Sequence, residues 1–359
     1  MHAGTFLIPS LIAFIAVLVM IPAMRRLALK SGYVDTPGGR KDHAEPTPPI
    51  GGIILFPVFI LVSLFSGIPA DQNIPYWAGL AVIVIAGALD DRFSLKPRWK
   101  FLAQFMAAGL IVWGGAQVAH LGNLLGFGTL WLGFMHIPFS VIAAVLLINA
   151  VNLMDGLDGL AGGKSLVALF WFLVCALFST SPAADNVVPS LLILIACVTG
   201  FLFYNMRSPL RDRATVFLGD AGSMGLGLSL AWFGMTLGHG NAPIAPPITV
   251  AWILALPIMD TCAQFARRVA HGRHPFDADR NHFHHHFINA GVSAAHTSLI
   301  IAAMGVALGA VGFTGIIWDV PEYVLAYLWI ALILTHIYLN LRPARIRRIV
   351  FAILKRKDG

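Results

Sequence analysis

The chain has 359 residues, of which 58% are hydrophobic and only 11% are charged, and its mean hydropathy is +0.78. Because a soluble domain carries roughly 25% charged residues, this composition excludes a soluble globular protein and indicates that a lipid bilayer is the solvent. The net charge of +7 comes from basic residues dispersed over six loops, which argues against nucleic-acid binding.

A helix needs about 20 apolar residues to cross the hydrocarbon core of a bilayer. Eleven apolar runs of about this length predict an all-α integral membrane protein with about eleven transmembrane helices. The predicted helices span residues 4–24, 50–66, 74–91, 101–118, 134–152, 164–180, 187–205, 218–237, 246–265, 298–318 and 322–341. Because Arg25 and Arg26 follow the first run and no Lys or Arg precedes it, we interpret that run as a span and not as a removable signal peptide. We expect one polytopic domain over residues 1–341 and a basic cytoplasmic tail over residues 342–359.

All 24 Lys and Arg residues fall in alternate gaps between the apolar runs. Basic residues in short loops stay on the cytoplasmic side of a membrane, so this segregation predicts an external N-terminus and a cytoplasmic C-terminus. The outer gaps are short except for residues 119–133, whose Gly and Asn residues between apolar pairs predict a small hairpin. The acidic and histidine clusters lie in the basic gaps, which places the chemistry on the cytoplasmic face.

Three polar clusters lie at the inner ends of these runs. Asp90 and Asp91 close the third run within GALDDRFSLK, and Asp220 opens the eighth within VFLGDAGS. The second cluster, in INAVNLMDGLDGLAGG, contains Asn149, Asn152, Asp155 and Asp158. A charged side chain in hydrocarbon costs roughly 2.5–3.5 kcal/mol on insertion scales, so such residues are paired, metal-bound or functional. Carboxylate and amide oxygens suit Mg²⁺, whereas the alternative is that these acids cap helices and pair with Lys or Arg.

Histidines are concentrated between the ninth and tenth runs, in HGRHPFDADRNHFHHHF. The six are His271, His274, His282, His284, His285 and His286. Three interpretations fit: a phosphate site in which Arg280 and the imidazoles bind oxygens, a zinc or iron site, or a solvated loop. The turn-rich first inner loop adds Arg40, Lys41 and His43, although membrane orientation alone explains its basic pair.

Six motifs occur in one order over most of the chain, namely VDTPGGRKDH, LDDRFSLKPRWKF, NAVNLMDGLDGLAGG, VFLGDAGS, PIMDTCAQFARR and DADRNHFHHHF. Together they resemble the polyprenyl-phosphate N-acetylhexosamine-1-phosphate transferase family, also called glycosyltransferase family 4. The Arg280-x-His282-x-His284 spacing and RKDH are similar to the branch that transfers N-acetylglucosamine-1-phosphate. The run of three histidines followed by Phe287 is partly similar to the cell-wall branch, the phospho-N-acetylmuramoyl-pentapeptide transferases.

The resemblance implies a transferase domain with a cytoplasmic-face cleft, in the cytoplasmic membrane of a bacterium. It implies Mg²⁺, with Mn²⁺ as an alternative ion, and two substrates: undecaprenyl phosphate from the bilayer and a UDP-N-acetylhexosamine from the cytoplasm. The implied products are undecaprenyl-diphosphate-sugar and UMP. The oligomeric state is left open, a homodimer included.

Family membership also implies a role for each residue that matches a motif. The implied metal ligands are Asn152 and Asp220. The implied catalytic residues are Asp90, Asp91, Asp155, Asp158 and His282. The implied substrate-binding residues are Lys41, His43, Asn149, Arg280, His284 and His285. Among them, Asp90 would orient or deprotonate the lipid phosphate, and Asp158 would contact the uridine side.

A cation transporter or a lipid flippase is the alternative from another class, since intramembrane acids often line ion paths. Transporters usually hold such charges near the bilayer midplane on broken helices. Here the acids gather at the inner helix ends, which favours the transferase.

Overall fold

The computed structural model describes residues 3–35, 46–207, 211–239, 243–274 and 282–342. Within these ranges there are thirteen α-helices and two short 3-10 helices, and strand-like pairing is limited to two isolated bridges. The α-helices are α1 (Leu7–Ser31), α2 (Gly51–Phe65), α3 (Ala70–Phe93), α4 (Pro97–Trp113), α5 (His136–Leu153), α6 (Leu160–Phe178), α7 (Ala184–Asn205), α8 (Gly219–Leu237), α9 (Pro247–Ile253), α10 (Ala255–Ala270), α11 (Phe283–Ile288), α12 (Ala294–Ile317) and α13 (Glu322–Asn340). The 3-10 helices are Ala3–Phe6 and Gly133–Met135. The predicted all-α fold class is confirmed.

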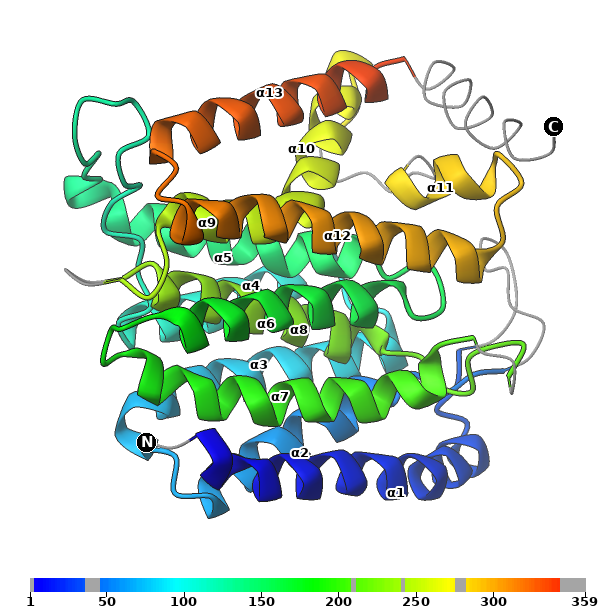
Figure 1. Ribbon diagram of the computed structural model, residues 1–359. Helices are drawn as coiled ribbons and strands as arrows, with labels where there is room; N and C mark the ends of the chain where they lie inside the picture. Colours follow the sequence, from blue (N-terminus) through cyan, green and yellow to red (C-terminus); the bar gives the residue numbers. More distant parts are fainter. Residues whose placement is uncertain (1–2, 36–45, 208–210, 240–242, 275–281, 343–359) are drawn as a thin grey trace, which may run out of the picture.

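The long helices lie side by side in one bundle, with α1 at one edge and α13 at the other (Figure 1). Ten of the eleven predicted runs coincide with one helix each, although their ends shift by several residues. By length and hydropathy, seven of the described helices could cross a membrane, or eight if α9 and α10 form one bent span. The chain is therefore a multi-pass membrane protein, and the full count of eleven spans stays a prediction.

The ninth predicted run, residues 246–265, is not one straight helix. It breaks at Leu254 into α9 and α10, whose axes differ by 74°. Pro257 explains the break, because its ring nitrogen has no hydrogen to donate to the Ile253 carbonyl and the ring collides with that carbonyl. The predicted span stays a prediction, since α9 and α10 together could form one bent span, but the bend itself was not predicted because the effect of this proline on a largely apolar run was overlooked.

Helix α8 is the centre of the bundle. Every residue from Ala221 to Met235 is buried, and α8 packs against α2, α3, α5 and α6. Small residues allow the closest of these approaches. A Cβ atom at Gly52 of α2 would lie 2.1 Å from the Gly222 amide nitrogen, so only a residue without a side chain fits there. The tight crossings hold the polar first turn of α8 in a fixed place.

The hairpin predicted over residues 119–133 is confirmed, while its place on the outer side of the membrane stays a prediction. His120 and Trp131 form an antiparallel bridge, and the Leu121 amide donates to the Leu130 carbonyl at 2.9 Å. The carboxylate of Glu322, at the start of α13, accepts from the Asn123 amide at 3.0 Å. The sequence has no Lys or Arg in the gaps at this end of the bundle, and the acidic clusters lie at the opposite end.

Candidate active site

The paired aspartates close α3 where this helix crosses the start of α8. At the crossing, a Cβ atom at Gly87 would lie 2.3 Å from the Ala221 amide nitrogen, so the two backbones touch. Residues three and four positions apart share a helix face, so Asp90 and Asp91 follow Gly87 toward the first turn of α8. The glycine thus sets the position of the acidic pair.

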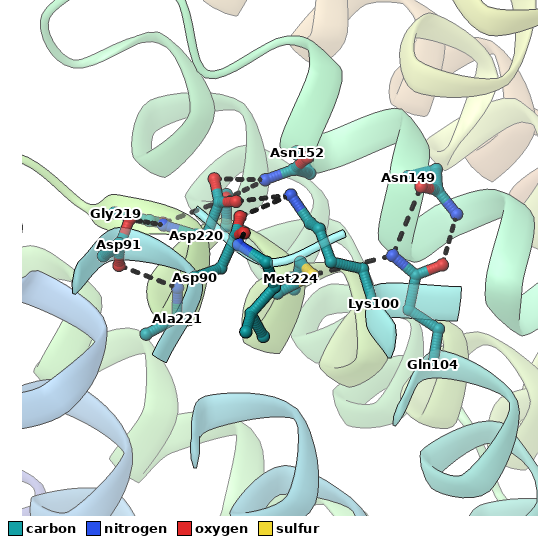
Figure 2. Close-up of polar contacts among 12 residues, drawn as sticks. Asp90, Asp91, Lys100, Gln104, Asn149, Asn152, Gly219, Asp220, Ala221 and Met224 are labelled. Carbon is teal, nitrogen blue, oxygen red and sulfur yellow. Dashed lines mark hydrogen bonds and ion pairs between the residues drawn. The ribbon is translucent and has the colours of Figure 1, made fainter. Parts of the chain in front are cut away.

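Asp91 caps α8 from a different helix. Its carboxylate oxygens accept from the backbone amides of Asp220 at 2.9 Å and Ala221 at 3.4 Å, two of the amides that have no partner within α8 (Figure 2). Gly219 has a φ of 74°, and a Cβ there would lie 2.6 Å from the Asp91 carboxylate. The contacts of Asp91 therefore match the helix-capping alternative, and its predicted catalytic role stays a prediction.

Lys100 joins two of the acidic clusters. Its ammonium nitrogen lies 2.7 Å from an Asp90 oxygen and 2.6 Å from an Asp220 oxygen (Figure 2). The other Asp90 oxygen accepts from the Leu95 amide at 2.7 Å. From the sequence, Lys100 was interpreted only as one of the basic residues that orient the chain in the membrane. Its place one turn inside α4, on the same face as Gln104, is the signal that could have identified it.

Asn152 brings α5 to the same point. Its side-chain nitrogen donates to Asp220 at 2.9 Å and to the hydroxyl of Ser223 at 2.9 Å. Residues from α3, α4, α5 and α8 therefore meet around the Asp220 carboxylate. The structure brings the two predicted metal ligands, Asn152 and Asp220, into direct contact.

Asn149 is turned into the bundle. It forms a reciprocal amide pair with Gln104 of α4, with N–O distances of 2.7 and 3.3 Å, and it donates to the Val145 carbonyl at 2.8 Å. Gln104 is 1% exposed. The Asn149 amide thus contributes to the packing of α4 against α5, and its predicted contact with substrate stays a prediction.

Asp155 lies between α5 and α6, outside both helices. Burial, followed by the negative charges of Asp220, Asp91 and Asp158, raises the pKa of the Asp155 carboxyl to about 8. The three acidic clusters therefore lie within electrostatic reach of one another. Such a pKa indicates a place where a cation would be stabilised, because positive charge favours the ionised carboxyl.

Asp158, in the same loop between α5 and α6, contacts two other segments of the chain. One of its oxygens lies 2.7 Å from Arg207 Nε and accepts from the Ala214 amide at 3.2 Å. Its own carbonyl accepts from the Ser298 hydroxyl on α12 at 3.0 Å. These contacts hold the loop in place, and the predicted uridine contact stays a prediction.

The histidine motif forms the short helix α11. His282, which precedes its first residue, lies with Nδ1 3.1 Å from an oxygen of Asp260 on α10. The His282 and His284 rings stack with centroids 5.9 Å apart, and the His285 ring is 4.1 Å from that of His284. Asp260 lies in the PIMDTCAQFARR motif but was not among the predicted site residues.

His284 faces the loop that carries Asp155. A Cβ atom at Gly156 would lie 3.0 Å from His284 Nε2. The imidazole is 1% exposed, and neither ring nitrogen has a hydrogen-bond partner among the described residues. Burial, and then the charges of His285 and His282, lowers the pKa of His284 to about 3, so the ring is neutral near pH 7. Lys41, His43 and Arg280 lie outside the described residues.

Comparison with known proteins identifies the family. The family model of glycosyl transferase family 4 matches residues 74–238. The undecaprenyl-phosphate alpha-N-acetylglucosaminyl 1-phosphate transferases of Yersinia pestis and Escherichia coli (strain K12) are each 31% identical to this chain. These matches cover 91% of the chain and 89% of the relative for the first, and 92% and 90% for the second. A probable undecaprenyl-phosphate N-acetylglucosaminyl 1-phosphate transferase of Bacillus subtilis (strain 168) is 33% identical over 82% of the chain and 80% of the relative.

The chain belongs to glycosyl transferase family 4. The segment matched by the family 4 model contains all three acidic clusters, from Asp90 to Asp220, together with Lys100. The histidine helix α11 follows that segment and lies within the longer matches to the two alpha-N-acetylglucosaminyl transferases, which cover about nine-tenths of the chain. The resemblance stated from the six motifs is thereby confirmed.

The donor set of this family 4 member is compatible with Mg²⁺. The described residues contain no group of three or more His, Cys, Asp or Glu side chains arranged to hold a metal ion. Mg²⁺ does not need such a group, because proteins usually bind it through one or two carboxylates while substrate phosphates and water fill its other positions. Asp220 and the Asn152 amide would provide such a partial set. The Lys100 ammonium lies between Asp90 and Asp220, so both carboxylates already face a positive charge.

Proposed function

We propose that this protein transfers N-acetylglucosamine-1-phosphate from UDP-N-acetylglucosamine to undecaprenyl phosphate, giving undecaprenyl-diphosphate-N-acetylglucosamine and UMP. The observation that carries the proposal is the convergence of Asp90, Lys100, Asn152 and Asp220 at one end of the bundle. The names of the three relatives support the choice of lipid acceptor and sugar.

The transfer joins two anions. An oxygen of the lipid phosphate attacks the sugar-linked phosphorus of the donor, and the bond from that phosphorus to the bridging oxygen of UMP breaks. Catalysis must come mainly from alignment and from neutralising negative charge. The phosphate monoester has a second pKa of about 6, so it is already a competent nucleophile near neutral pH. Direct attack therefore needs no aspartyl-phosphate intermediate.

The residues around Lys100 would have separate roles in aligning the substrates and neutralising their charge. Asp90, fixed by Lys100 and the Leu95 amide, would orient the lipid phosphate or take up its remaining proton. The Lys100 ammonium would offset negative charge on the phosphates when they approach. His282 and His284, on the other side of the Asp155 loop, would donate hydrogen bonds to the diphosphate together with Arg280.

Asp220 and Asn152 are the residues that would hold Mg²⁺, or Mn²⁺ in its place. When bound, the ion supplies positive charge that offsets the charge of the donor diphosphate and of the departing UMP.

The site end of the bundle would face the cytoplasm. The described Lys and Arg residues of the loops gather at the helix ends that carry Asp90 and Asp220, and the sequence has none in the intervening gaps. By the positive-inside rule, the N-terminus would lie outside and the C-terminus inside the bacterial cytoplasmic membrane. Labelling of single cysteines placed at residues 127 and 96 tests this, with external labelling expected only at residue 127.

UMP release by the purified protein in detergent is the decisive assay. With undecaprenyl phosphate and UDP-N-acetylglucosamine, we expect UMP and the lipid-linked sugar in equal amounts, dependent on Mg²⁺. Asp220→Asn should abolish UMP release while the variant still folds. Asp185→Asn is the matched control, because Asp185 lies in the first turn of α7, at the end of the bundle away from the site. Turnover of Asp220→Asn at limiting Mg²⁺ equal to wild type would remove the proposed metal role.

Other outcomes identify the competing functions. Release of UMP only with UDP-N-acetylmuramoyl-pentapeptide would assign the chain to the cell-wall branch. A screen of related UDP-N-acetylhexosamines identifies the preferred sugar. No release with any donor, together with ion or lipid movement across sealed vesicles, would indicate a transporter or flippase instead.

A further inference from the structure

Asp260 is a buried carboxylate that the proposed mechanism does not yet use. It lies on the inner face of α10 and is 1% exposed. One oxygen accepts from the Phe283 amide at 3.0 Å and lies 3.4 Å from the Gln264 side-chain nitrogen. The other lies 3.1 Å from His282 Nδ1. A buried carboxylate is costly unless it is hydrogen-bonded, so these partners explain how it is tolerated.

The same contacts fix His282 in two ways. Because a carboxylate only accepts hydrogen bonds, Nδ1 must be the ring nitrogen that donates to Asp260, and Nε2 is the ring nitrogen that remains for a contact with substrate. The Phe283 amide is the first amide of α11, so Asp260 also fixes the backbone where the histidine helix begins. Both the ring and the backbone of His282 are therefore set by α10.

The histidine row in turn lies against the acidic loop. The His282 ring stacks on His284 at an interplanar angle of 6°, and His284 abuts Gly156, the neighbour of Asp155. A rotation of the His282 ring would disturb this stack. The orientation that Asp260 imposes on one imidazole thus extends to the edge of the proposed reaction site.

We propose that Asp260 is a positioning residue for the transfer reaction, which acts by accepting a hydrogen bond from His282 Nδ1–H and so holding the imidazole with its Nε2–H directed to donate to a substrate phosphate oxygen. The inference rests on the proposed function for the reaction that His282 serves. It predicts that Asp260 contributes to turnover only while His282 is present. Loss of the carboxylate that orients a functional histidine typically costs about 10–100-fold in metal sites, and we expect a similar loss in kcat here.

A double-mutant cycle separates this role from a purely structural one. The variants are Asp260→Asn, His282→Gln and the double variant, with kcat and KM measured by UMP release. If Asp260 acts through His282, the double variant should be no slower than His282→Gln alone, and Asp260→Glu should recover part of the loss. Multiplied losses in the double variant, or a wild-type kcat in Asp260→Asn, would overturn the proposal.

Thr261→Val is the matched control. Thr261 is 1% exposed, adjoins Asp260 on α10, and its hydroxyl has no hydrogen-bond partner among the described residues. We expect its kcat and thermal unfolding midpoint to stay close to wild type, which shows that α10 tolerates a polar-to-apolar change beside Asp260.

The tautomer of His282 provides a readout that does not depend on turnover. Solid-state NMR of ¹⁵N-histidine-labelled protein in lipid, with the signal assigned by its loss in His282→Gln, should show the proton on Nδ1 in wild type and in Asp260→Glu. An Nδ1 atom without a proton in the wild type would overturn the proposal even in an active enzyme. Absence of UMP release by the wild type would instead contradict the proposed function.

Discussion

The ammonium nitrogen of Lys100 lies 2.6 Å from a carboxylate oxygen of Asp220, a residue 120 positions later in the chain. The same nitrogen lies 2.7 Å from Asp90, so one cation neutralises carboxylates from two helices. Phosphate groups that enter this region would meet both the cation and the acids. The balance of charge at the site therefore depends on one lysine, which lies in the LDDRFSLKPRWKF motif but was not predicted as a site residue.

Lys100→Met should reduce UMP release by about 100-fold or more, because the variant lacks the cation that would face the phosphates and leaves Asp90 and Asp220 without their shared partner. Lys100→Arg keeps the charge and should retain more activity. Lys96→Met, an exposed change just before α4, is the control and should leave kcat within a few-fold of wild type. Equal kcat values for the Lys100→Met and Lys96→Met variants would contradict a role for Lys100.

Asp91→Ala should mainly lower the stability of the folded protein, with a smaller direct effect on kcat. The substitution removes the acceptor for the Asp220 and Ala221 amides, and loss of a helix cap costs about 0.5–2 kcal/mol. Asp91→Asn keeps one accepting oxygen and should lose less. Thermal unfolding in detergent measures the cost, and kcat below the unfolding transition measures any direct effect. A variant with unchanged stability but no turnover would show that Asp91 acts in catalysis and not as a cap.

Much of this arrangement could be predicted from the sequence, because apolar runs of the right length locate helices and basic loops locate one membrane face. The acidic and histidine clusters were also correctly placed at one end. The partners of each residue could not be predicted, since they depend on how helices cross. Asp91 reaches the amides of α8 only because Gly87 and Ala221 touch, and Asn149 turns inward only because Gln104 lies opposite. Neither contact can be recognised from the spacing of residues along one helix.

The neutral imidazole of His284 predicts a pH dependence of stability. Its pKa is about 3 in the folded protein and 6.5 in an unfolded chain, so between these values the unfolded state binds more protons. Stability should therefore fall as the pH falls below 6.5, by about 2 kcal/mol from this residue between pH 7 and pH 5. Thermal unfolding at both pH values tests this with His284→Gln, which cannot take up the proton. The wild type should lose more stability on acidification than the variant, and equal losses would contradict a buried neutral His284.

Gly156→Ala tests whether the acidic loop and the histidine helix must touch. A methyl group at Gly156 would lie 3.0 Å from His284 Nε2 and 3.3 Å from Cε1, closer than ordinary packing allows, so the ring must move away from the loop. Because His282 immediately precedes α11, we expect kcat to fall by about 10-fold or more, as misplacement of positioning groups by a fraction of an ångström is costly. Gly163→Ala, in the first turn of α6, is the matched control, because nothing lies within 4 Å of the added methyl group. Within α6 that change should slightly raise the thermal midpoint and leave kcat unchanged. If Gly156→Ala and Gly163→Ala turn over equally fast, contact between His284 and the Asp155 loop is not needed for the reaction.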